Sequence, residues 1–190
     1  MIRRMMQALA HRASQALADT GPERRVLHGI HVWVLNDREH ASTEALFRKA
    51  AEALDRIAGV QPWRIAMMRR DFARIVIRQN TGCRALLDAA GSCVLDTFFV
   101  ATFSPAQVAA SIVHESVHAR LRREGRAVPA ELIAWEERLC RRAELGFGMR
   151  VPDGAAVVER ARAALALSDA DVAPLAGGIH LRPTRRRSGH

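Results

Sequence analysis

Hydrophobic and polar positions alternate early in the chain and then change to a helical spacing. In 24–35 the apolar residues Ile30, Val32 and Val34 alternate with other side chains, and this period of two predicts a strand. In 43–57 apolar residues recur every three or four positions, which predicts an amphipathic helix: Leu46, Phe47, Ala50, Leu54 and Ile57. The segment 24–57 therefore predicts a strand followed by a helix.

The middle of the chain is rich in residues that favour strands. Segments 63–68 and 72–79 are both predicted strands, and 80–82 (Asn-Thr-Gly) has the composition of a turn. Segments 83–87 and 92–101 then predict a hairpin that leads into the next helix. Strands and helices in this order predict an α+β fold.

The most regular helical pattern lies in 104–123. Ser104 can cap this helix, Pro105 suits its first turn, and Gln107 completes a capping box with Ser104. Gly125 is expected to end it. Apolar residues surround the centre of the helix, so we expect it to be buried: Val108, Ile112, Val113, Val117 and Leu121.

This helix carries the sequence His-Glu-Ser-Val-His. His114 and His118 are four residues apart and therefore share one helix face, where two imidazoles can hold one metal ion. Glu115 lies about 100° around the helix, within reach of a metal-bound water without being a ligand itself. The motif predicts metal-assisted hydrolysis, with Glu115 as general base. The alternative is a buried helix with two hydrogen-bonded histidines.

The next predicted helix, 129–147, offers a third ligand. Helical angles place Glu136 within an apolar stripe, and such a position is costly for a carboxylate that lacks a charged partner. Glu137, Glu144 and Glu131 fall on flanks that we expect to be solvated. Glu136 is therefore the predicted third ligand and Glu131 the alternative; Glu136 could instead pair with an arginine. The predicted stripe consists of Leu132, Trp135, Leu139, Ala143 and Phe147.

Three regions follow from these patterns. Residues 1–22 predict an amphipathic helix or extension that docks on the domain, and 23–170 form the domain itself. Within it, Asp153 can cap a further helix that runs to about 167. Residues 171–190 are a basic tail that we expect to be disordered.

Composition narrows the function further. The chain has 190 residues, 49% of them hydrophobic, which suits a single domain with a core. It contains no run of eighteen apolar residues, so no transmembrane helix is predicted. Cys83, Cys93 and Cys140 form no C-x-x-C pair, which argues against a disulfide framework and favours the cytoplasm. The net charge of +9 could attract nucleic acid, but the few aromatic residues do not alternate with the basic ones.

The motif residues carry a resemblance to a known family. A His-Glu-x-x-His helix, followed 18 residues after the second histidine by a glutamate on the next helix, resembles the gluzincin type of zincin metallopeptidase. The likeness covers mainly 92–152, and it extends to small bacterial proteins with this motif. It implies a compact zincin-like domain whose small, mostly antiparallel sheet packs on the two ligand-bearing helices, with a sheet edge that holds extended peptides.

By that resemblance, His114, His118 and Glu136 are the ligands of one zinc ion and Glu115 is the general base. The chain has no tyrosine to stabilise an oxyanion, and Trp135 and Cys140 replace the asparagine and aspartate that accompany the glutamate in some gluzincins. The sequence therefore predicts a soluble zinc-dependent hydrolase that acts on a peptide or protein. The alternatives are a zincin-like domain that binds metal without catalysis and serves as a regulatory or interaction module, and a basic nucleic-acid binder in which the motif is incidental.

Overall fold

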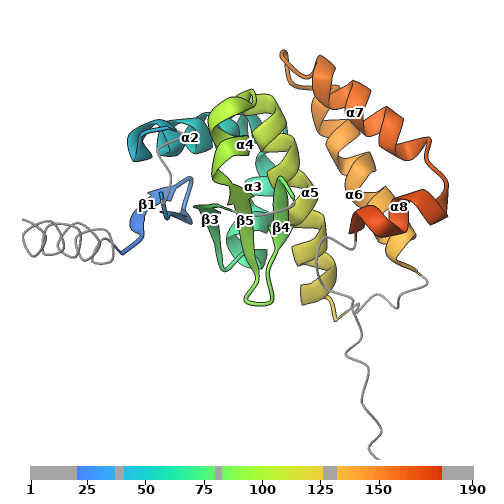
Figure 1. Cartoon of the computed structure of the whole chain (residues 1–190), viewed down its shortest axis with the longest axis horizontal. Helices are drawn as coiled ribbons and strands as arrows, with labels where there is room; N and C mark the ends of the chain where they lie inside the picture. Colours follow the sequence, from blue (N-terminus) through green and yellow to red (C-terminus); the bar gives the residue numbers. More distant parts are fainter. Residues whose placement is uncertain (1–20, 37–40, 80–82, 126–131, 177–190) are drawn as a thin grey trace, which may run out of the picture.

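Five strands form one mixed sheet in this computed structural model, which describes residues 21–36, 41–79, 83–125 and 132–176 (Figure 1). The strands, in the order β1-β2-β3-β5-β4, are β1 (Glu23–Leu27), β2 (Ile30–Val34), β3 (Arg74–Arg78), β5 (Ser92–Asp96) and β4 (Ala85–Leu87). The two inner pairings, β2 with β3 and β3 with β5, are parallel, and the two outer pairings are antiparallel. The α+β class is confirmed, whereas the expectation of a mostly antiparallel sheet is wrong.

The parallel pairing has a local cause in the segment between β2 and β3. Helices α2 (Thr43–Val60) and α3 (Pro62–Asp71) form a crossover there, and such a connection returns the chain parallel to its starting strand. The prediction of a strand at 63–68 is therefore wrong. Pro62 stands at the start of α3, and Ile65 and Met68 are buried three residues apart, as on one face of a helix.

The predicted hairpin of 83–87 and 92–101 is present in part, and a second hairpin stands where one strand was predicted. The strand predicted at 24–35 is a hairpin of β1 and β2, because His28 and Gly29 both adopt positive φ in its turn. Strand β4 pairs with β5 as predicted, but β5 ends at Asp96, whose side chain caps the short helix α4 (Thr97–Thr102). Asp96 is thus a helix cap.

The central helix α5 (Pro105–Arg123) lies between the sheet and a group of three helices (Figure 1). Its capping box between Ser104 and Gln107 is present, as predicted. On one side, α2, α4 and α5 share a core with alternate residues of the strands. On the other side, α5 packs against α6 (Ile133–Gly148), which in turn contacts α7 (Ala155–Leu165) and α8 (Asp169–Ala176).

The ends of the chain differ from the expected boundaries in two details. Helix α8 extends to Ala176 and buries Val172 against the domain, so the ordered part continues past residue 170. Asp153 does not cap α7, which has Gly154 at its N-cap; it binds Arg56 of α2 instead. The predicted N-terminal helix in 1–20 and the tail from 177 lie outside the described residues. None of the described helices has the length and apolar character needed to cross a membrane.

Candidate metal centre

Helix α5 holds His114 and His118 on the face that meets α6. Its capping box and Pro105 fix where the helix begins, so the two histidines, four residues apart, project in the same direction. His114 is buried and His118 is partly buried, with 9% and 21% of the side chains exposed. The imidazole rings are 4.9 Å apart between centroids. Both rings can therefore act on one small ligand.

A carboxylate of α6 binds the Nδ1 atom of each histidine. Nδ1 of His114 is 2.7 Å from Oε1 of Glu144, and Nδ1 of His118 is 2.6 Å from Oε1 of Glu136. An ionised carboxylate only accepts hydrogen bonds, so each Nδ1 carries the proton and donates it. In the neutral imidazole the other nitrogen, Nε2, then presents its lone pair. This is the arrangement in which metal-binding histidines are commonly held.

The two Nε2 atoms point at a common centre, and Cys140 joins them there. The Nε2 atoms are 3.1 Å apart, and Sγ of Cys140 is 3.5 Å from Nε2 of His118. The ligand atoms of His114, His118 and Cys140 all lie within 4.8 Å of one another. Tetrahedral zinc, with Zn–N near 2.05 Å and Zn–S near 2.3 Å, places two nitrogens about 3.3 Å apart and nitrogen and sulfur about 3.5 Å apart. The His114–His118 and His118–Cys140 spacings therefore fit two edges of a tetrahedral metal site.

Glu137 closes the fourth side of the centre. Its Oε1 atom is 3.1 Å from Nε2 of His118, and its Oε2 atom is 3.5 Å from Nε2 of His114. Only 6% of its side chain is exposed. A carboxylate between two Nε2 atoms can stabilise protons on them, and the same oxygens can bind a metal ion or a water beside it.

The buried face of α6 differs from the predicted one. The predicted stripe included Leu132 and Trp135, but both are exposed. The face that packs inward is rotated by roughly 130° around the helix and consists of Ala134, Glu137, Cys140, Glu144, Phe147 and Gly148. Glu137 and Glu144, expected in solvent, are therefore buried. They are tolerated because α5 presents two histidines to them, and buried charges require such partners.

The predicted site residues do not all meet at the centre. Glu136 contacts His118 at Nδ1, on the opposite side of the ring from the shared centre, so its position suits a residue that orients a ligand. Glu131, the alternative ligand, lies outside the described residues. Glu115 is buried, and its carboxylate interacts electrostatically with both histidines; on β5, burial and the charge of Glu115 raise the pKa of the Cys93 thiol.

The charges of this cluster shift one another's pKa values. Burial disfavours protonated His114, but the hydrogen bonds to Glu137 and Glu144 outweigh burial and raise the pKa of His114 to about 10. Burial likewise opposes protonation of His118, whose pKa is nonetheless raised well above its ordinary value by Cys140, Glu136 and Glu137. In the absence of a metal ion, these carboxylates and the Cys140 thiol therefore favour the protonated form of both imidazoles.

The carboxylates respond in the opposite sense. Burial disfavours ionised Glu144, but His114, Arg141 and Arg160 outweigh it and lower the pKa of Glu144 to about 2. Arg141 and Arg160 each donate a hydrogen bond to this carboxylate, at 2.6 and 2.9 Å. Glu115 behaves differently: burial raises its pKa, although the two histidines oppose the shift.

No family model, curated protein or solved structure matches this chain. The likeness to zincins therefore depends on the motif alone, and function has to be argued from the cluster itself. Sequence reasoning did not identify Cys140, Glu137 and Glu144 as parts of this cluster. Their spacing of three and four residues, which keeps all three on one helix face, was the signal available for them.

Proposed function

We propose that this protein is a zinc-dependent hydrolase that cleaves peptide bonds, with its metal ion bound by His114, His118 and Cys140. The proposal revises the ligand set expected from sequence, in which Glu136 was the third ligand. Two imidazoles and a thiolate are donors that suit zinc. In this assignment Glu136 and Glu144 orient the two histidines by accepting hydrogen bonds from their Nδ1 atoms.

One observation carries the metal assignment. The carboxylates fix both Nδ1 protons, so two Nε2 lone pairs converge at 3.1 Å. Two converging lone pairs repel each other unless a cation lies between them, and the cation is either a proton or a metal ion. The nearby Cys140 sulfur favours a metal ion, because a thiolate is a strong zinc ligand.

Hydrolysis requires a base next to the metal. A bound divalent ion supplies Lewis acidity, which polarises a carbonyl oxygen and acidifies water. Glu115 is the proposed base: it is buried, it interacts electrostatically with both histidines, and burial raises its pKa, which makes a carboxylate a stronger proton acceptor. It would take a proton from the attacking water and deliver it to the leaving amine.

A second function is favoured by Glu137. Its carboxylate lies between the two Nε2 atoms and can serve as a fourth protein ligand. Structural zinc sites have four protein ligands, whereas catalytic sites keep one position open for water. If Glu137 binds the metal, the site stabilises the packing of α5 on α6 and the protein is a metal-binding regulatory or interaction module.

Metal content tests the shared part of both proposals. Purified protein is expected to contain about one zinc ion per chain, and the double variant His114→Gln/His118→Gln is expected to contain none. The matched control is His31→Gln, which changes an exposed histidine of β2. Equal zinc content in the double variant and the control would overturn the site.

Activity then separates catalysis from structure. Zinc-loaded wild type is assayed against a quenched fluorescent peptide library, beside Glu115→Gln and Glu137→Gln. We expect Glu115→Gln to retain zinc and to lose peptidase activity by at least about 100-fold, the lower end of the range for one acid–base group. Zinc-loaded wild type without activity, together with loss of zinc in Glu137→Gln, would support the structural site and contradict the hydrolase.

A further inference from the structure

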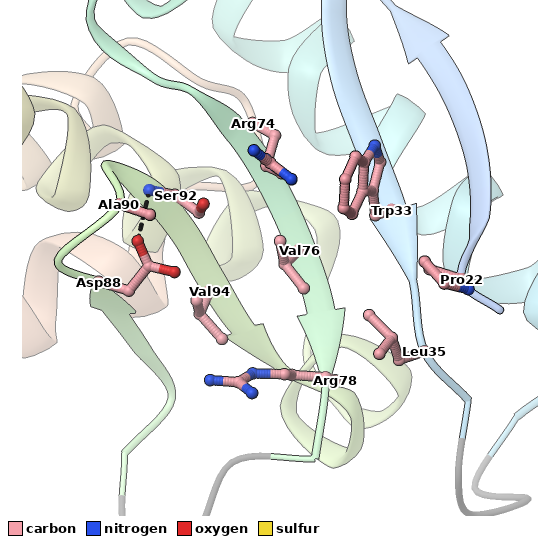
Figure 2. A pocket seen from close by; sticks show the side chains of 10 residues that line it. All are labelled: Pro22, Trp33, Leu35, Arg74, Val76, Arg78, Asp88, Ala90, Ser92 and Val94. Carbon is pink, nitrogen blue, oxygen red and sulfur yellow. Dashed lines mark hydrogen bonds between the residues drawn. The ribbon is translucent and has the colours of Figure 1, made fainter. Parts of the chain in front are cut away.

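The second face of the sheet carries a separate set of side chains. Residues Ile75 and Ile77 of β3 belong to the core shared with the helices, so the alternate residues of β3 point to the opposite face. Figure 2 shows this face, with side chains from β2, β3 and β5 and from the β4–β5 turn. Val76 and Val94 lie at its centre; both are buried, yet neither belongs to the core cluster.

These side chains form a groove of about 280 Å³. Val76 and Val94 lie between two sides: Trp33, Leu35 and Pro22 on one, and Asp88, Ala90 and Ser92 on the other (Figure 2). Arg74 and Arg78 lie at its two ends (Figure 2). The groove is thus apolar along its centre and basic at its ends, and it is remote from the histidine cluster, which lies on the α6 side of α5.

We propose that residues 1–20 of the same chain dock as an amphipathic helix in this groove. This inference is independent of the metal centre. It assigns a position to a segment for which the sequence predicts only that it docks somewhere on the domain.

The sequence of the segment has the required pattern. At 100° per residue, seven of the nine apolar residues of 2–17 fall within a stripe about 120° wide, and Ala8 and Ala10 lie outside it: the seven are Ile2, Met5, Met6, Leu9, Ala13, Ala16 and Leu17. Arg3, Arg4, Gln7, His11 and Ser14 fall outside this stripe. A helix with one such stripe requires an apolar surface to cover it.

The connection to the groove is short. Segment 1–20 is joined to Pro22, which lines the groove, through Gly21 alone. A tether this short keeps the segment at an effective concentration in the millimolar range. The sixteen residues 2–17 would form a helix about 24 Å long, while five strands span about 19 Å between the outermost two. The segment is therefore long enough to cover the groove.

The charges around the groove favour this occupant over a second copy of the same face. Arg24 and Arg74 stack on the ring of Trp33, at 4.5 and 4.0 Å from its centroid, and Arg78 is exposed nearby. Two such basic faces would repel each other, whereas an amphipathic helix can turn its own arginines toward solvent. The arginine stems also extend the apolar contact surface.

Collisional quenching of Trp33 tests the docking in the full-length chain. The other two tryptophans are first replaced (Trp63→Phe, Trp135→Phe), since both are exposed. Leu9→Arg places a charge in the apolar stripe and is expected to raise the acrylamide quenching constant of Trp33 about twofold, because the indole loses its cover. Gln7→Arg adds the same charge outside the stripe and is expected to leave the quenching constant unchanged. Equal constants in the parent and both variants would overturn the proposal.

Cross-linking supplies a second measurement that does not depend on fluorescence. In a Cys83→Ser background, Leu9→Cys is combined with Ala90→Cys at the groove or with Glu159→Cys on the distant helix α7. A short bis-maleimide is expected to link the first pair within one chain and to leave the second unlinked. Equal linking of both pairs would overturn the docking proposal. Linkage only between chains would overturn it in favour of a second copy of the chain. Protection of Trp33 that appears only with anionic vesicles would overturn it in favour of a membrane surface.

Discussion

Glu144 accepts a hydrogen bond from Nδ1 of His114 at 2.7 Å while Arg141 and Arg160 bind the same carboxylate. The side chain of Glu144 is 1% exposed, so this ionised group depends entirely on these three partners. It fixes the His114 tautomer and joins the motif helix α5 to α6 and α7. The relationship suits a residue that prepares a metal ligand, and it is open to direct test.

Replacement of this carboxylate is expected to weaken both metal binding and folding. Glu144→Gln preserves the shape but removes the charge that orients His114, so we expect zinc affinity to fall by about 10- to 100-fold. Loss of one partner in a buried ionic network is expected to cost about 3 kcal/mol of unfolding free energy. Competition with a chromogenic chelator and urea unfolding measure the two effects.

Glu159→Gln is the matched control, since this glutamate is exposed on α7. It is expected to change neither zinc affinity nor stability. Unchanged zinc affinity in Glu144→Gln, with reduced stability alone, would mean that Glu144 is only a structural partner of the arginines.

The identity of the third ligand is tested by comparing Cys140 with Glu136. Cys140→Ser is expected to lower zinc affinity by more than about 100-fold, because a direct ligand is lost, whereas Glu136→Gln is expected to lower it by only about 10- to 100-fold. The cobalt-substituted protein should show a thiolate-to-metal charge-transfer absorption that disappears in Cys140→Ser. Cys83→Ser controls for thiol removal elsewhere. Retention of that absorption in Cys140→Ser, or a larger loss of affinity in Glu136→Gln, would restore Glu136 as the ligand.

Without metal, stability is expected to depend on pH through the same cluster. Hydrogen bonds to Glu137 and Glu144 outweigh burial and raise the pKa of His114 to about 10, from 6.5 when unfolded. A raised pKa gives stability that is fully present below about pH 6.5 and is lost as the pH rises through about 10. The pKa of Glu144 is lowered from 4.5 to about 2, which gives stability above about pH 4.5 that is lost as the pH falls through about 2.

Urea unfolding in the presence of a chelator is therefore expected to show its highest midpoint between about pH 4.5 and 6.5 and a progressive fall toward pH 10. Excess zinc should reverse this trend above about pH 6.5, because metal ions replace the protons on Nε2 and compete better as the pH rises. His114→Gln should flatten the metal-free profile at its alkaline side. An identical alkaline slope in that variant would show that other groups cause it.

Local signals predicted the parts of the fold that depend on short stretches of chain. The capping box of Ser104 and Gln107, the burial of α5 and the convergence of His114 and His118 all follow from residues within one helix. The strand at β5 and its pairing with β4 were also evident from turn residues and apolar composition.

The features of the fold and of the site that were predicted wrongly depend on contacts between distant segments. Glu137 and Glu144 were predicted in solvent because α6 was oriented by its apolar residues, but its inward face is set by the histidines of α5. A carboxylate can occupy a buried face when a cation from another element meets it, and such a partner is invisible in the periodicity of one helix. The same limit explains why a strand was predicted at 63–68. Pro62 and the preceding helix make this segment, although rich in strand-favouring residues, part of helix α3.

The contact of α7 with α6 rests on a glycine, which gives a final prediction. A Cβ atom at Gly154 would collide with the carbonyl oxygen of Gly148 and with Val151. Gly154→Ala is therefore expected to displace α7 and to cost about 3 kcal/mol of unfolding free energy. It should also weaken zinc binding, because Arg160 of α7 supports Glu144. Gly59→Ala is the matched control: α2 leaves open space there, and we expect a gain of up to about 1 kcal/mol. Urea unfolding and chelator competition measure both variants, and a Gly154→Ala protein as stable as its parent would contradict the close approach of the two helices.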